Sequence, residues 1–166
     1  MTEAMAALSA LANCDCAERG SALDGFYAKW RDESLVVDKW FAVQATSRLP
    51  GTFEQVQDLM HHEAFDIKNP NKVRAVIGAF CHGNHARFHA ADGRGYAFAA
   101  EQIITLDAIN AQIAARLARS FDRWRRFDQQ HRQHARGALE RIRATEGLSK
   151  DTFEVVSNAL AETNLC

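Results

Sequence analysis

The sequence contains one group of residues whose types could bind a metal ion. Cys81, His85 and His89 are spaced four residues apart, and His82 lies beside the first of them. Thiolate and imidazole groups bind zinc and similar ions, and a spacing of four places side chains on one face of a continuous helix. Gly83-Asn84 is expected to interrupt that helix. We therefore favour a structural role for these residues over a metal site.

A second stretch, His62-Glu63-Ala64-Phe65-Asp66, matches part of the His-Glu-x-x-His motif of zinc proteases. In that motif two histidines one helical turn apart hold the metal, and the glutamate acts as the base. Here an aspartate stands in place of the second histidine, and the preceding His61 would point to another side of the helix. We interpret the stretch as a polar helix end. No nucleophile elbow or phosphate-binding loop occurs elsewhere, so we expect no catalytic residue and no metal ligand in this chain.

Arginines are frequent between residues 116 and 143, which could indicate a basic surface for nucleic acid. Acidic residues interrupt this segment, among them Asp122, Asp128 and Glu140, and the formal net charge of the chain is −1. Mixed charges of this kind are typical of a solvated helix, and His131 and His134 are assigned to the same exposed surface. We expect no nucleic-acid partner.

The length of 166 residues predicts a single domain over residues 1–166. No apolar run is long enough to span a bilayer, so we expect no membrane association. The four cysteines, Cys14, Cys16, Cys81 and Cys166, are interpreted as reduced thiols. These features together predict a cytoplasmic protein.

Helical periodicity dominates the sequence, and no run of alternating residues predicts a sheet. One helix is expected to begin with Asn69 as its cap and Pro70 in its first position. Its apolar stripe consists of Val73, Val76, Ile77 and Phe80. The glycines at 93 and 95 predict a tight connection before the next helix. The fold class is therefore all-α, with short turns that favour stacked antiparallel helix pairs.

Three further local predictions concern helix boundaries and packing. Thr52 and Gln55 are expected to form a capping box. The charged segment from Phe121 to about residue 146 has an apolar stripe of helical period. Asn110 and Ser149 are expected to cap the helices that follow them, and the last helix is expected to pack through Phe153, Val156 and Leu160.

Two motifs in this chain resemble a known family. They are Asn-Pro-Asn-Lys-Val-Arg at residues 69–74 and Phe-His-Ala-Ala-Asp-Gly-Arg-Gly-Tyr at residues 88–96, and they are accompanied by matches at 35–46, 106–117 and 148–154. These stretches are similar to the C-terminal helical domain of bacterial aminopeptidase N, a zinc alanyl aminopeptidase of the gluzincin class. The resemblance implies an armadillo- or HEAT-like superhelical array.

The resemblance also implies a function. Whole enzymes of that family use zinc-activated water to remove single residues from peptide N-termini, and their zinc and base would lie outside this chain. The piece alone is expected to be inactive. Its implied role is to cap the active site, line the substrate channel and help to orient peptides, with the catalytic domain of the parent enzyme and peptide substrates as its partners.

Arg74 and Arg116 are the candidate substrate-binding residues. Each lies within a family-like motif and off the main apolar stripe of its helix. The resemblance implies that they face the far end of the peptide, where a planar guanidinium can hold a carboxylate. A salt bridge within the domain or an interaction with a helix C-terminus is an equally good interpretation.

Two other functions remain open. A free-standing helical scaffold could bind a protein partner through one concave face. A small metal-binding protein could instead be built on the cluster from Cys81 to His89, and it would need a bound metal for stability.

Overall fold

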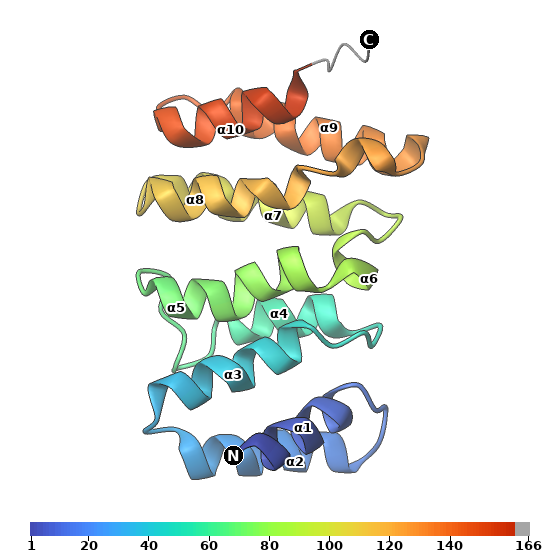
Figure 1. Cartoon of the computed structure of the whole chain (residues 1–166), viewed down its shortest axis with the longest axis vertical. Helices are drawn as coiled ribbons and strands as arrows, with labels where there is room; N and C mark the ends of the chain where they lie inside the picture. Colours follow the sequence, from blue (N-terminus) through green and yellow to red (C-terminus); the bar gives the residue numbers. More distant parts are fainter. Residues whose placement is uncertain (162–166) are drawn as a thin grey trace. The chain divides into compact units, whose positions relative to one another are not determined.

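A computed structural model describes residues 1–161, and every regular element in that range is a helix (Figure 1). The all-α prediction is confirmed. The chain divides into two compact units, which we call unit 1 and unit 2, with the boundary between Arg87 and Phe88. The single domain over residues 1–166 stays a prediction. In the described range, no helix has the length and apolar character needed to cross a membrane.

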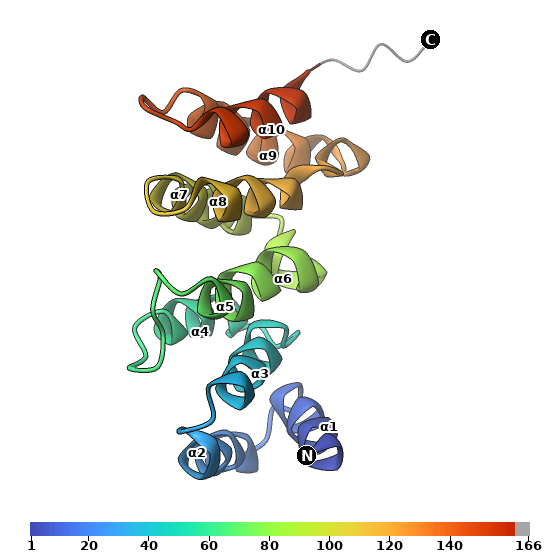
Figure 2. The same cartoon turned by 60° about the vertical axis from the view of Figure 1, so that its left-hand side comes forward.

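Unit 1 is arranged around its third helix. Its elements are α1 (Thr2–Ala12), α2 (Glu18–Trp30), α3 (Ser34–Ala45), α4 (Thr52–Leu59), α5 (Pro70–Val73) and the π-helix η1 (Arg74–Gly83). The short α6 (His85–Phe88) spans the unit boundary. Helix α3 packs against α1, α2, α4 and η1, as Figure 2 shows. Phe41 on this helix is fully buried and marks the centre of the core of unit 1.

The predicted helix after Asn69 forms, but most of it is a π-helix. The Asn69 side chain accepts a hydrogen bond from the Asn71 N–H at 3.0 Å, which confirms the predicted cap. From Arg74 onward the wider turn of a π-helix lets consecutive side chains face the core. Ala75, Val76 and Ile77 are therefore all buried. All four residues of the predicted apolar stripe are buried as well.

Unit 2 consists of two stacked helix pairs. Its elements after α6 are α7 (Arg94–Asp107), α8 (Ala111–Ala118), two short 3₁₀-helices η2 (Arg119–Phe121) and η3 (Trp124–Arg126), α9 (Gln129–Arg143) and α10 (Lys150–Leu160). Helix α7 packs against α8 and α9, and α10 packs against the same two helices (Figure 1). This arrangement agrees with the predicted stacking of helix pairs.

Local caps fix where the helices of unit 2 begin. The Asn110 side chain accepts a hydrogen bond from the Ile113 N–H at 3.2 Å, and the Ser149 hydroxyl accepts one from the Thr152 N–H at 3.3 Å. The Ser149 hydroxyl also donates to Asp107 at the end of α7, at 2.5 Å. Burial alone would raise the pKa of the Asp107 carboxyl, but hydrogen bonds from Ser149 and Thr152 outweigh it and lower that pKa. Both predicted caps are confirmed.

The predicted capping box at Thr52 does not form. Gly51 is the N-cap residue of α4, and no side chain bonds to the free N–H groups of its first turn. Thr52 is instead the first helical residue, and its hydroxyl is buried without a hydrogen-bond partner. The sequence pattern placed the cap one residue too late.

Two other predictions for unit 2 need correction. The charged segment after Phe121 is not one long helix, because α9 begins only at Gln129, after η3 and an extended residue at Phe127. In α10 the side chain of Phe153 is 48% exposed, whereas Thr152 is buried. Val156 is buried as predicted.

The cysteines within the described range form no disulfide with one another. Cys14 is exposed and Cys16 is half-buried in the loop after α1, while Cys81 is buried in η1. Cys166 lies outside the described residues.

Candidate functional site

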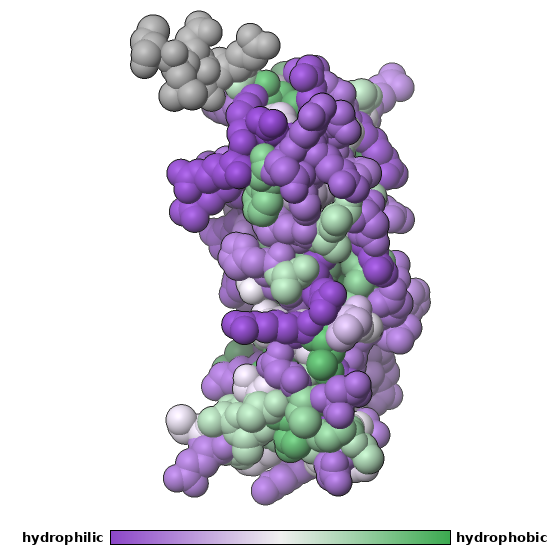
Figure 3. Space-filling view, turned by 90° about the vertical axis from the view of Figure 1, so that its right-hand side faces the viewer, coloured by the Kyte–Doolittle hydropathy of each residue, from purple (hydrophilic) through white to green (hydrophobic). Residues whose placement is uncertain are grey.

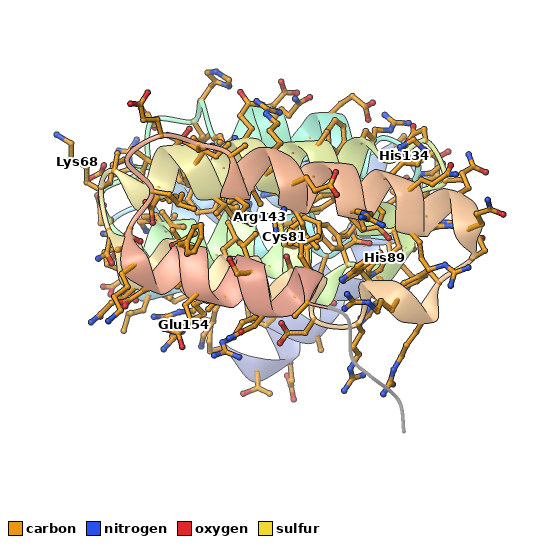
Figure 4. The ribbon with its side chains drawn as sticks, turned by 90° about the horizontal axis from the view of Figure 1, so that it is seen from above. Lys68, Cys81, His89, His134, Arg143 and Glu154 are labelled. Atoms are coloured by element: carbon orange, nitrogen blue, oxygen red, sulfur yellow. The ribbon has the colours of Figure 1, made fainter. Side chains whose placement is uncertain are left out.

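A groove of about 430 Å³ lies between α8 and α10 in unit 2. Its lining residues are Gln112, Ala115 and Arg116 on α8, Arg119 at the start of η2, and Asp151, Glu154, Val155 and Asn158 on α10. Positive side chains therefore line one wall and negative side chains line the other. Figure 4 shows Glu154 pointing outward from α10.

The packing of α8 decides which of its residues reach the groove. Ala114, Leu117 and Ala118 face the core and are buried. The helical period then leaves Arg116 on the outer side, where it is exposed, and Arg119 at the start of η2 is exposed as well. The Ser149 hydroxyl at the start of α10 donates to Asp107 at the end of α7, and this bond helps to position α10, the opposite wall of the groove, beside α8.

The charges across the groove do not neutralise each other directly. In residues 1–161, the ion pairs include none between the two walls, and Arg119 makes only a long contact with Asp122 at 3.9 Å. A guanidinium presents a planar fork of donors that matches a carboxylate. The positive wall could therefore hold a carboxylate, such as the one at the C-terminus of a peptide.

Arg74 has a different environment from Arg116. It is exposed in the first turn of η1, and its guanidinium donates to the Asn71 side-chain oxygen at 3.3 Å. Its aliphatic stem lies close to Gly78, where an added Cβ would be 3.7 Å from the Arg74 Cγ. Arg74 thus has a neutral hydrogen-bond partner three residues earlier in the chain, and its role in substrate binding stays a prediction.

The predicted interruption after Cys81 is present. Helix η1 ends at Gly83, and the Asn84 side chain donates to the carbonyls of Ala45 and Ser47 at 3.0 and 2.7 Å. Cys81, labelled in Figure 4, is buried in unit 1, and this burial raises the pKa of its thiol. No group of three or more His, Cys, Asp or Glu side chains within the described range could hold a metal ion.

His62 packs among aromatic side chains. Its ring lies 4.7 Å from that of Tyr27 and 5.2 Å from that of Trp40, and its Nδ1 accepts a hydrogen bond from the Ala64 N–H. Glu63 accepts a hydrogen bond from the Tyr27 hydroxyl at 2.9 Å. These contacts attach the end of α4 to α2 and α3, which agrees with the structural interpretation of this stretch.

A cluster that the sequence did not predict surrounds His89. Its ring stacks on Phe127 with centroids 4.2 Å apart, and its Nδ1 lies 2.7 Å from the Tyr96 hydroxyl. Burial, followed by the charge of Asp128, raises the pKa of Tyr96 to about 12. His131 also contacts this cluster, although the sequence assigned it to a solvated surface. Periodicity carries no signal for a contact between residues so far apart in the chain.

Three comparisons with known proteins agree on one family. Residues 1–161 match the family described as domain of unknown function DUF3458_C, ARM repeats. Aminopeptidase N of Escherichia coli (strain K12) is 41% identical over 161 residues, which are 97% of this chain and 18% of that protein. Aminopeptidase N of Haemophilus influenzae is also 41% identical, over 96% of this chain and 18% of that protein.

A solved structure gives the same result. The crystal structure of Legionella pneumophila aminopeptidase A in complex with aspartic acid matches with a TM-score of 0.90 and 36% identity, over 96% of this chain and 19% of that chain. This chain therefore spans less than a fifth of the length of these relatives. The expected armadillo-like class and the resemblance to the C-terminal region of aminopeptidase N are confirmed. The chain belongs to the DUF3458_C family of ARM-repeat domains.

Proposed function

We propose that this chain forms the channel wall of a zinc aminopeptidase that removes N-terminal residues from peptides. It would cap the active site and help to orient the substrate, with the catalytic domain of the same polypeptide and peptides as its partners. The similarity to aminopeptidase N over nearly the whole chain supports this proposal. The enzyme would act in the cytoplasm.

The groove between α8 and α10 is the observation that carries the proposal. Arg116 lies on its positive wall, in one of the stretches that resemble the family. A peptide whose amino end lies at a catalytic centre has its carboxylate at the far end. An arginine with no acidic partner across the groove is well suited to bind that carboxylate. Arg74 is the second candidate for this role.

The catalytic zinc would be held by residues outside this chain, so the isolated chain should not hydrolyse peptides. An assay of the isolated chain with an alanyl amide substrate and added zinc tests this expectation. Zinc-dependent turnover by the chain alone would contradict it.

Kinetics of the parent enzyme would test the arginines directly. Arg116→Ala should raise KM roughly ten- to a hundredfold for short peptides with a free C-terminal carboxylate, because a charge-assisted hydrogen bond contributes about 1.5–3 kcal/mol. The same peptides with an amidated C-terminus should be unaffected. Arg143→Ala, at an exposed arginine of α9, is the matched control. Equal losses for the acid and the amide would argue against carboxylate binding, and Arg74→Ala tests the second candidate in the same way.

A free-standing scaffold that binds a protein partner remains the alternative. Small apolar residues on α1 are exposed, namely Ala4, Ala6, Ala7 and Ala10, and Figure 3 shows an apolar surface near that end of unit 1. An immunoblot of source cells with an antibody against this chain separates the two proposals. A band several times larger than this chain supports the aminopeptidase, and a band at the size of the chain supports the scaffold.

A further inference from the structure

The start of α9 is attached to the connection between α6 and α7, residues 89–93, by side chains from two helical turns. The Gln130 side chain donates to the Ala91 carbonyl at 3.0 Å. The ring of His131 lies 2.9 Å from the His89 carbonyl oxygen. His134 packs against Gly93, where an added Cβ would lie 2.4 Å from its ring. Figure 4 shows His89 and His134 at the same end of unit 2.

The two nitrogens of the His131 ring both face groups that only accept hydrogen bonds. Nδ1 lies 2.8 Å from the Asp128 carboxylate, and Nε2 faces the His89 carbonyl. A neutral imidazole has one N–H and one lone pair, so it can donate only one of these bonds. Both bonds form only when the ring carries two protons and a positive charge.

We propose that His131 is a doubly protonated imidazolium that clamps the start of α9 onto the 89–93 connection, and that loss of one proton releases this clamp. The side chain is positioned for the task because Asp128 also caps α9 through the His131 N–H, at 3.0 Å. The Phe127 ring lies 5.7 Å from that of His131 and stacks on His89. The helix cap, the charge of Asp128 and the aromatic contact thus all hold the His131 ring in the same position.

The surroundings of the ring favour the charged form. The hydrogen bond to Asp128 raises the pKa of His131, burial opposes this effect, and the His89 carbonyl adds to it. The backbone and side chain of His131 in turn lower the pKa of Asp128. The titratable side chains of the neighbouring cluster are His89 and Tyr96, which contact each other at 2.7 Å, and Tyr96 keeps its proton near neutral pH because its pKa is raised to about 12.

The directions of the two pKa shifts determine the pH range in which the clamp forms. The folded pKa of His131 is raised, so its contribution is complete below its unfolded pKa of about 6.5 and is lost as the pH rises through the folded value. The folded pKa of Asp128 is lowered, so its contribution is complete above its unfolded pKa of about 3.9 and is lost as the pH falls through the folded value. The clamp is therefore strongest between the unfolded pKa of aspartate, about 3.9, and that of histidine, about 6.5. Unit 2 should become less stable as the pH rises through the folded pKa of His131.

NMR titration of the unmodified chain tests the proposal without a variant. The ring signals of His131 should report two N–H groups at pH 6 and a titration midpoint above the ordinary value for histidine. Amide signals of the 89–93 connection should shift with the same midpoint. A His131 midpoint at or below the ordinary value, or a single ring N–H at pH 6, would overturn the proposal.

Stability measurements on variants test what the proton does. His131→Arg keeps a planar donor whose charge does not titrate, and His131→Gln removes the charge. Urea unfolding of the unmodified chain between pH 6 and pH 8.5 should show a roughly two- to fivefold loss in the folding equilibrium constant, the scale of a partly exposed ion pair. That pH dependence should disappear in both variants and persist in His61→Gln, a control at an exposed histidine of unit 1. The same pH dependence in all four proteins would also overturn the proposal.

Discussion

Each unit contains an ion pair of one cation and one carboxylate at a contact between two of its segments, which we call a joint. The two joints differ in how deeply their side chains are buried. In unit 1, Lys72 lies 2.6 Å from Asp38, and the exposed fractions of their side chains are 8% and 15%. In unit 2, His131 lies 2.8 Å from Asp128, and the corresponding fractions are 17% and 66%. The first joint attaches α5 to α3 directly. In the second, both charged residues belong to the start of α9, and the His131 ring attaches it to the 89–93 connection through the His89 carbonyl.

The difference shows where a protein can use a titratable cation. The Lys72 ammonium also donates to the carbonyl and hydroxyl of Ser34, each at 3.3 Å, so its donors are occupied and water is largely excluded. A charge lost there would leave a buried carboxylate without a partner, which is costly. Asp128 is exposed enough for water to replace its partner, so the joint in unit 2 can lose a proton at small cost. A buried ion pair thus needs a cation such as lysine, which stays charged at neutral pH. An exposed pair can use a histidine, whose charge changes near neutral pH.

The largest effect should follow from breaking the buried joint. Asp38→Ala leaves the Lys72 ammonium without its carboxylate and should destabilise the protein by about 3–5 kcal/mol. Urea unfolding at pH 7 measures this loss. The double variant Asp38→Leu/Lys72→Met removes both charges and should recover most of the stability. A loss below about 1 kcal/mol for Asp38→Ala would mean that the joint in unit 1 is as solvated as a surface pair.

A smaller effect should follow from crowding the joint in unit 2. Gly93 has φ of 75°, and a side chain there would also collide with His134. Gly93→Ala should cost about 2–3 kcal/mol, the sum of backbone strain and overpacking. Gly147 is a matched control, because its φ is 77° and no atom lies within 4 Å of an added Cβ. Gly147→Ala should therefore cost only the backbone term, about 1 kcal/mol.

If the two glycine variants lose equal stability in thermal unfolding, the close approach of His134 contributes nothing. The same substitution in a protein with a second change, at residue 134, separates the cost of backbone strain from the cost of the collision. In a protein that already carries His134→Gly, which removes the Cβ of residue 134 as well as its ring, the cost of Gly93→Ala should fall toward that of Gly147→Ala.

The smallest effect should come from Asp128→Asn. Asparagine caps helices about as well as aspartate, so α9 should still begin at the same residue. The change removes the negative charge that favours the imidazolium, and the His131 midpoint in an NMR titration should move down. An unchanged midpoint would show that the His89 carbonyl alone sustains the charged form.

Local chemistry in the sequence predicted several features that the structure confirms. Asn69, Asn110 and Ser149 were expected to cap helices, and each side chain accepts a backbone N–H within three residues. Gly93 was expected in a tight connection, and it has the left-handed backbone conformation that glycine favours. These predictions succeed because the interacting groups are neighbours in the chain.

Predictions that depended on distant contacts were less successful. The segment after Phe121 does not continue as a helix, and its side chains bond to the end of α10 instead. The Trp124 ring N–H donates to the Ala159 carbonyl at 2.9 Å, and the Arg125 guanidinium donates to the same carbonyl at 2.6 Å. These bonds satisfy free carbonyls at a helix end, and no local pattern could indicate them. Phe153 is likewise exposed because the neighbouring Thr152 faces the core of unit 2.

At the candidate site, too, the sequence predicted the residue and the packing of helices decided its surroundings. The sequence singled out Arg116 through a motif, but only the packing of α8 on α10 places it opposite Asp151 and Glu154 in a groove. The sequence treated His131 as a surface residue, and only the fold brings it to the carbonyl of His89, 42 residues earlier in the chain.

The sequence by itself determined the helical class, the helix caps at Asn69, Asn110 and Ser149, the turn glycine at 93 and the family resemblance, because these depend on periodicity and on groups that are neighbours in the chain. The tertiary structure alone decided the π-helical conformation of residues 74–83, the opposed charges of the groove and the double acceptor environment of His131. Each of these features depends on which helices pack together, and packing joins groups that lie far apart along the chain.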